Sequence, residues 1–166
     1  MGKPVAVVVG IGAERGLGAA LCRRFAVGGC HVLVVGGTAD KIDKVAKTIV
    51  SSGGSATPVV TDATREDDVA RLFDRAMAPG AGFDPADLVA SNAGNNQRLD
   101  LREVTAAQSK TSGASAVSAG FLVGREAARR FVPLGRGTIF TGASASVRGK
   151  PGFGLQPHAK EVSRTA

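Results

Sequence analysis

Three glycines near the N-terminus have the spacing of a loop that binds phosphate groups. Gly12, Gly16 and Gly18 follow an apolar run that ends at Val9. We expect Gly12 to permit the sharp turn off a strand, Gly16 to let the backbone approach a pyrophosphate, and Gly18 to let the next helix pack close to the sheet. The literal G-x-G-x-x-G pattern is absent, because Arg15 occupies its last position. The loop indicates nucleotide binding, with a glycine-rich turn that holds no cofactor as the alternative.

Short apolar runs predict the strands that would position this loop. Five such runs lie at 4–9, 31–35, 58–60, 87–90 and 137–141. Helical patterns separate them, so the expected fold class is α/β, a Rossmann-like doubly wound parallel sheet with strand order 3-2-1-4-5. In that order the ends of the first and fourth strands lie side by side, at the point where such sheets bind ligands.

Apolar residues at helical spacing predict the helices between these strands. The first begins at Gly16, the second is capped by Thr38, the third opens with a capping box at 64–67, and the last spans 121–131. The residues expected to face the core from the first three helices are Leu17, Leu21 and Phe25, then Ile42, Val45, Ala46 and Ile49, then Val69, Leu72, Phe73 and Met77.

The composition limits the classes of protein that fit the chain. With 166 residues and 43% hydrophobic content, residues 1–166 suit one domain with a buried core. No apolar run approaches the roughly 18 residues of a membrane span and no signal peptide pattern is present, so we expect a cytoplasmic protein without membrane contact. Cys22 and Cys30 lack metal-ligand spacing, and we interpret them as reduced packing residues without a metal.

The net charge of +7 does not indicate a nucleic-acid partner. Lys and Arg are dispersed over separate predicted helices, and the chain has neither Trp nor Tyr on which bases would stack. An anionic cofactor makes better use of the same charge.

Further polar residues follow the other predicted strands in a particular order. Asp62 follows the third strand, the fourth ends at Asn92, Ala93 and Gly94, and Ser144 lies beyond the fifth. Together with the glycine loop, from about residue 5 to about residue 152, this order resembles the short-chain dehydrogenase/reductase family. The resemblance implies that Asp62 contacts the adenine region and that the Asn92 turn supports the sheet and the cofactor, although Asn92 also suits an ordinary strand-end turn.

Charge at the end of the second strand favours NADP(H) over NAD(H). A carboxylate there would bind the ribose hydroxyls of NAD, but this chain has Gly36-Gly37-Thr38. Arg15 would pair with a 2′-phosphate and Thr38 would donate a hydrogen bond to it. The expected cofactor-binding residues are Gly12, Arg15, Gly16, Leu17, Gly18, Thr38, Asp62, Asn92, Ala93 and Gly94.

The resemblance also implies catalytic positions, and one of them is altered. In the family a Ser polarises the substrate carbonyl, a Tyr passes the proton, and a Lys four residues later lowers the pKa of the Tyr and holds the ribose. Ser144, with Ser146 as the alternative, matches the Ser, and Lys160 matches the Lys. Gln156 stands at the Tyr position in a chain that has no Tyr, and an amide cannot pass a proton. His158 is a weak substitute, because it would face elsewhere on a helix and follows Pro157.

Two segments depart from the family pattern. Residues 109–120 lack an apolar stripe where the family has a long core helix. Ala116 stands near the position at which the family has a helix Asn that belongs to its proton relay. Suitable codons for residues 109–120, read one nucleotide out of register, can spell an amphipathic helix, so we interpret the segment as a frame shift, with a natural flexible insert as the alternative. The coding DNA decides between them. The tail, 153–166, is also atypical, and we expect the C-terminal part of the family fold to be missing.

These observations predict an NADP(H)-dependent oxidoreductase of the short-chain type, acting on a small-molecule carbonyl compound or secondary alcohol and impaired by the loss of the Tyr. The alternatives are a non-catalytic nucleotide-binding or partner-binding remnant and a poorly folded product that exposes apolar surface. Family members usually pair through long helices, so a homo-oligomer is also possible.

Overall fold

Five parallel strands pair in the order β3-β2-β1-β4-β5 in a computed structural model, which describes residues 2–94 and 105–141. The strands are β1 (Val5–Val9), β2 (His31–Gly36), β3 (Ser55–Val60), β4 (Leu88–Ser91) and β5 (Thr138–Thr141). This order confirms the doubly wound parallel sheet. Val9 of β1 pairs with Ser91 of β4, so these two strands end together at one edge of the sheet.

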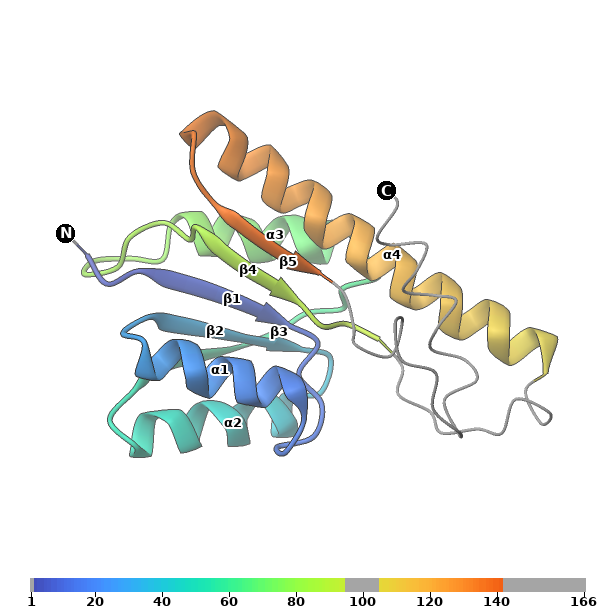
Figure 1. The fold of residues 1–166 in the computed structure, drawn as a ribbon, viewed down its shortest axis with the longest axis horizontal. Helices are drawn as coiled ribbons and strands as arrows, with labels where there is room; N and C mark the ends of the chain where they lie inside the picture. The colour runs from blue at the N-terminus through green and yellow to red at the C-terminus, as the bar shows by residue number, and fades with distance from the viewer. Residues whose placement is uncertain (1, 95–104, 142–166) are drawn as a thin grey trace.

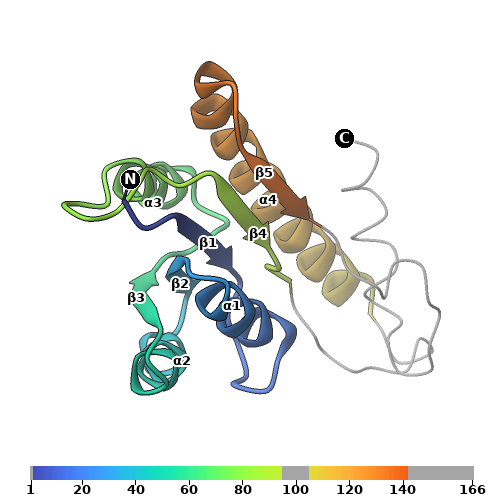
Figure 2. The ribbon, with the colours of Figure 1, turned by 60° about the vertical axis from the view of Figure 1, so that its left-hand side comes forward.

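Helices cover both faces of the sheet. They are α1 (Leu17–Val27), α2 (Ala39–Ser51), α3 (Glu66–Met77) and α4 (Ala106–Phe131), with a short 3-10 turn at Val132–Leu134. Figures 1 and 2 show α1 and α2 together on one face and α3 and α4 on the other. No helix in 2–94 or 105–141 is long and apolar enough to cross a membrane.

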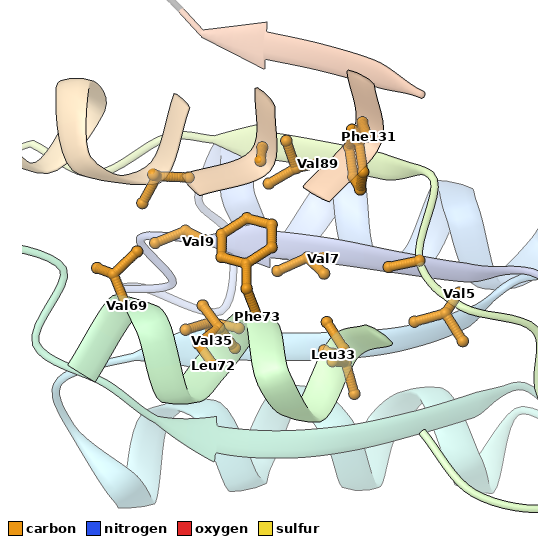
Figure 3. Packing of buried hydrophobic residues seen from close by; sticks show 14 of the residues in the cluster. Val5, Val7, Val9, Leu33, Val35, Val69, Leu72, Phe73, Val89 and Phe131 are labelled. Atoms are coloured by element: carbon orange, nitrogen blue, oxygen red, sulfur yellow. The ribbon is translucent and has the colours of Figure 1, made fainter. Parts of the chain in front are cut away.

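Alternate residues of the strands fill two separate cores. Val7 and Val9 point to the α3 and α4 side, whereas Val8 points to the α1 and α2 side. Phe73 is fully buried in the first core, where it meets Phe131 edge to face with ring centroids 6.4 Å apart. Figure 3 shows the Phe73 ring between these valines and the end of α4. Both faces of the central strands are buried, as continuous apolar runs predict.

The buried face of α1 differs from the predicted one. Gly18, Ala19 and Cys22 are buried, while Leu17 is 58% exposed. Gly18 brings the start of α1 close to the sheet, so small side chains take the fully buried positions there. Leu21 and Phe25 of the predicted stripe are partly buried and pack against the same core. The predicted stripe of α2 and the buried positions Val69, Leu72 and Phe73 of α3 are confirmed.

The predicted caps of α2 and α3 are not formed by their side chains. Thr38 occupies the N-cap position of α2 without a capping hydrogen bond from its side chain. Arg65, not Thr64, is the N-cap of α3, and the hydroxyl and backbone N–H of Thr64 both donate to Asp62 Oδ1, at 2.6 and 2.9 Å. In the predicted box the Thr64 oxygen would accept a bond from a backbone N–H of α3, whereas here its hydroxyl donates a charge-assisted hydrogen bond to Asp62.

The helix predicted at 121–131 is longer than expected. α4 begins at Ala106 and includes the whole of segment 109–120, which lacks an apolar stripe. Its second half is anchored by Leu122, Val123, Ala127 and Phe131, all buried. Each residue added to an existing helix costs little compared with starting one, so the anchored half extends backwards over Ala and Ser residues.

Candidate functional site

The glycine loop lies at the edge of the sheet where β1 and β4 end. The backbone N–H groups of Gly10 and Ile11 both donate to the carbonyl of Val35, each at 3.0 Å, and that of Asn92 donates to Val9 at 2.8 Å. The loop after β1 is therefore held on one side by β2 and on the other by the turn after β4.

The sharp turn off β1 falls on Gly10 and not on Gly12, which corrects the expectation from the sequence. Gly10 has φ +92°, and a Cβ there would lie 2.4 Å from the backbone nitrogen of Ala93. Gly12 has no such φ, and a Cβ built on it meets nothing within 4 Å. The sequence feature that could have predicted this turn was the position of Gly10 directly after the strand. Gly12 faces open space, which leaves room for a ligand.

Gly18 brings α1 into contact with the ends of β1 and β4. A Cβ at Gly18 would lie 2.8 Å from Ile11 Cδ1, 3.3 Å from the carbonyl oxygen of Gly10 and 3.4 Å from Asn92 Nδ2. Asn92 Nδ2 itself donates to that carbonyl at 3.4 Å. The close helix–sheet packing expected of Gly18 is present, and Asn92 joins the two strand ends.

Neither the N-cap residue nor the first turn of α1 supplies a side chain that would neutralise the N-terminus of this helix. Gly16 is the N-cap and supplies no side chain, and the first turn contains no acidic residue. The first backbone N–H groups of a helix have no partner within it, and they carry a partial positive charge. Together with the open space at Gly12, this end of α1 fits the pyrophosphate of a dinucleotide.

Charged side chains surround the outer part of the loop. Glu14 pairs with Lys44 of α2, with 2.9 Å between Oε2 and Nζ. Arg23 of α1 donates to the carbonyl of Glu14 at 3.1 Å. Arg15 is exposed, and no ion pair or hydrogen bond ties it to the described part of the chain. Sequence reasoning missed the pairing of Glu14, because Lys44 lies 30 residues away in sequence.

The end of β2 lies beside the same loop. A Cβ at Gly36 would lie 2.8 Å from the carbonyl oxygen of Ile11, so the two backbones are in contact. Thr38 is exposed and its hydroxyl is not used in capping, and Asp40 follows in the first turn of α2. No carboxylate occupies the last residue of β2 or the two residues after it.

Asp62 follows β3 at this edge but already has a local role. Its Oδ1 accepts both hydrogen bonds from Thr64, and these hold the pKa of the carboxyl below its usual value. Asp62 therefore stays ionised at neutral pH. One oxygen orders the turn into α3, and Oδ2 accepts no bond from the described residues.

An apolar cavity of about 350 Å³ adjoins the loop on the α1 side of β4 and β5. Its lining includes Leu17, Leu21, Phe25 and Phe140, together with Asn92. The predicted core stripe of α1 thus lines a cavity beside the candidate site.

The predicted catalytic residues Ser144 and Lys160 lie outside the described residues, as do Gln156 at the Tyr position and the alternatives Ser146 and His158. Ala116 lies in α4 and is half-buried. Within 2–94 and 105–141, no group of three or more His, Cys, Asp or Glu could hold a metal ion. Cys22 is buried, and burial raises the pKa of its thiol to about 12.

Comparisons with known proteins agree on one family. Residues 5–157 match the family described as short chain dehydrogenase. Among curated relatives, gluconate 5-dehydrogenase of Gluconobacter oxydans (strain 621H) is 32% identical over 77% of this chain and 49% of its own. Versicolorin reductase 1 of Dothistroma septosporum is 31% identical over 94% of this chain and 58% of its own. The chain thus spans about half the length of these relatives.

Solved structures agree with this result. A short-chain dehydrogenase from Rhodopseudomonas palustris superposes with a TM-score of 0.80 and 31% identity, covering 98% of this chain and 74% of the other. A protein from Beutenbergia cavernae, described as a putative NAD(P)-dependent gluconate 5-dehydrogenase with bound NADP at low occupancy, superposes with a TM-score of 0.79 and 26% identity, covering 98% of this chain and 63% of the other.

Proposed function

The chain belongs to the short-chain dehydrogenase family, and on that premise we propose that it is an NADP(H)-dependent oxidoreductase acting on a carbonyl compound or a secondary alcohol, with impaired turnover. The observation that carries this proposal is the uncapped N-terminus of α1 beside the open Gly12, where β1 and β4 end. This arrangement suits a dinucleotide pyrophosphate.

Residues around the loop would hold the cofactor. Gly12, Gly16 and the first turn of α1, beginning at Leu17, would bind the pyrophosphate, while Gly18 keeps that turn against the strand ends. Asp62 would use its free Oδ2 near the adenine, and Asn92, Ala93 and Gly94 would support the side nearer the reaction. The nicotinamide, when bound, supplies or accepts the hydride.

The preference for NADP(H) rests on charge. Arg15 is exposed and unpaired within the described chain, and Thr38 has a hydroxyl free to donate. Both would bind a 2′-phosphate, and no carboxylate occupies the last residue of β2 or the two residues after it to repel that phosphate. The NADP described in the similar gluconate 5-dehydrogenase structure is consistent with this assignment.

The chemical step would depend on Ser144 and Lys160. The Ser144 hydroxyl would polarise the substrate carbonyl, and Lys160 would hold the ribose. Gln156 stands where a proton donor is needed, and its amide has no proton to give at accessible pH. Turnover should therefore be slow even where the cofactor binds.

Restoring the missing hydroxyl tests this proposal. We expect Gln156→Tyr to accelerate NADPH oxidation with a panel of small aldehydes and ketones by roughly a hundredfold or more, the usual effect of a positioned acid. The matched control is Gln156→Phe, which adds the ring without the proton and should stay at the level of the native chain. Absorbance of NADPH gives the rate, and equal rates for the Tyr and Phe variants would contradict the assigned role.

A further inference from the structure

An ion pair ties the glycine loop to the helix beside it. Glu14 lies in the loop directly before Arg15, and its carboxylate meets Lys44 of α2 at 2.9 Å. The carbonyl of the same residue accepts a bond from Arg23 at 3.1 Å. Glu14 is thus held from two helices, whereas the adjoining Arg15 makes no hydrogen bond or ion pair within the described residues and acts on Glu14 only through its charge, the smallest of the influences that lower the pKa of Glu14.

A carboxylate next to Arg15 is unfavourable for binding a phosphate. Hydrogen bonding and the charge of Lys44 hold the pKa of Glu14 below its usual value, so the group is ionised at neutral pH. If Lys44 were absent, the free carboxylate would compete for the Arg15 guanidinium and would repel a nearby 2′-phosphate. With Lys44 in place, the pair is locally neutral and the positive charge of Arg15 is not cancelled.

The pair contributes little to folding. The side chains of Lys44 and Glu14 are 68% and 42% exposed, and ion pairs this open to water add almost nothing to the stability of a protein. Variants at these positions should fold, and their effect should be seen in the binding of an anion.

We propose that Lys44 is a specificity-determining residue: it neutralises Glu14, which leaves Arg15 free to bind the 2′-phosphate of NADP(H). This inference rests on the proposed function, because it assumes that Arg15 faces that phosphate. Lys44 acts through Glu14 and is a positioning residue, not a catalytic one.

Titrations of NADPH and NADH, followed by calorimetry at low ionic strength, test the inference without requiring turnover. We expect Lys44→Gln to raise the Kd for NADPH roughly threefold to fivefold, the scale of one exposed charge pair, and to change the Kd for NADH less than about twofold. The double variant Glu14→Gln/Lys44→Gln should bind NADPH about as well as the native chain, because the interfering carboxylate is gone. Lys47→Gln removes the same charge one turn further along α2 and should have no effect on either ligand.

The outcomes separate the alternatives. An equal loss for both cofactors in Lys44→Gln would overturn the inference in favour of a general effect on the loop. A double variant as weak as Lys44→Gln would also overturn it, since Lys44 would then contact the phosphate directly. Normal NADPH binding by Lys44→Gln would reject the inference and leave the proposed function standing, whereas a native chain that binds neither cofactor would overturn both. Urea unfolding of each variant verifies that it is folded.

Discussion

Gly12 and Gly18 lie in one loop and have opposite surroundings. A Cβ at Gly18 would lie 2.8 Å from Ile11 Cδ1 and 3.3 Å from the carbonyl of Gly10, so this glycine serves the packing of α1. A Cβ at Gly12 would touch no protein atom within 4 Å. The packing of the described residues therefore does not require a glycine at 12, and on the proposed function the open space there is room for the pyrophosphate.

This contrast predicts two different phenotypes. Gly18→Ala should lower the free energy of unfolding by about 1 kcal/mol, because the crowding near Ile11 outweighs the better helix propensity of Ala. Gly12→Ala should leave the free energy of unfolding unchanged but raise the Kd for NADPH roughly tenfold, the equivalent of about 1.4 kcal/mol. Urea unfolding and calorimetric titration of both variants check this. Gly12→Ala with native affinity would place the pyrophosphate elsewhere.

At the scale of elements, His31 joins two strands at the opposite edge of the sheet. Its ring nitrogens make hydrogen bonds with Ser55 Oγ at 2.7 Å and Thr57 Oγ1 at 3.1 Å, which ties β2 to β3. The ring also stacks on Phe83, with 4.2 Å between centroids. Burial, followed by the charges of Lys3 and Arg75, lowers the pKa of His31.

The lowered pKa predicts a loss of stability in mild acid. The unfolded chain takes up a proton at His31 at higher pH than the folded chain does, so protonation favours unfolding. The free energy of unfolding should be constant above about pH 6.5 and fall as the pH drops from there towards the lower pKa of the folded state. Urea midpoints at about pH 7.5 and about pH 5.5 measure the change. His31→Gln should remove this pH dependence of stability, and His158→Gln should retain it. The reverse result would contradict the prediction and assign the dependence to His158.

Helices and strands were predictable from the sequence where a single pattern of apolar residues fitted only one type of secondary structure. The branched run before Gly10 could only be a buried strand, and the stripe of Ile42, Val45 and Ile49 fits only a helix. The buried face of α1 was predictable from hydrophobicity only in part: Leu21 and Phe25 pack against the core, but Gly18 admits the helix so close to the sheet that Ala19 and Cys22 take the fully buried positions. The start of α4 was missed because its first half has no apolar stripe and extends from an anchored second half.

The candidate site was predictable in part for a similar reason. The glycines and Asn92 lie close to strands in sequence, so the strand order brought them together correctly. The turn at Gly10 depends on the approach of Ala93, and the Glu14–Lys44 pair joins residues on different elements. Such contacts exist only once the sheet and α2 are packed, and no local pattern signals them.

At the scale of the whole molecule, the described chain is a nucleotide-binding half with an exposed last strand. All four residues of β5 are exposed, with Ile139 at 38% and Phe140 at 58%. The chain also spans only about half the length of its curated relatives. Dinucleotide binding is the part of the proposed function that rests on the described residues, and it can be measured independently of turnover.

The most direct test of this account is a calorimetric titration of NADPH, with NADH alongside, into the purified 166-residue chain. We predict saturable binding with a lower Kd for NADPH, because the uncapped end of α1 takes the pyrophosphate and Arg15 takes the 2′-phosphate. The absence of binding heat with either cofactor, from a sample whose urea unfolding is cooperative, would contradict the proposed function. The family membership would then indicate common ancestry without cofactor binding.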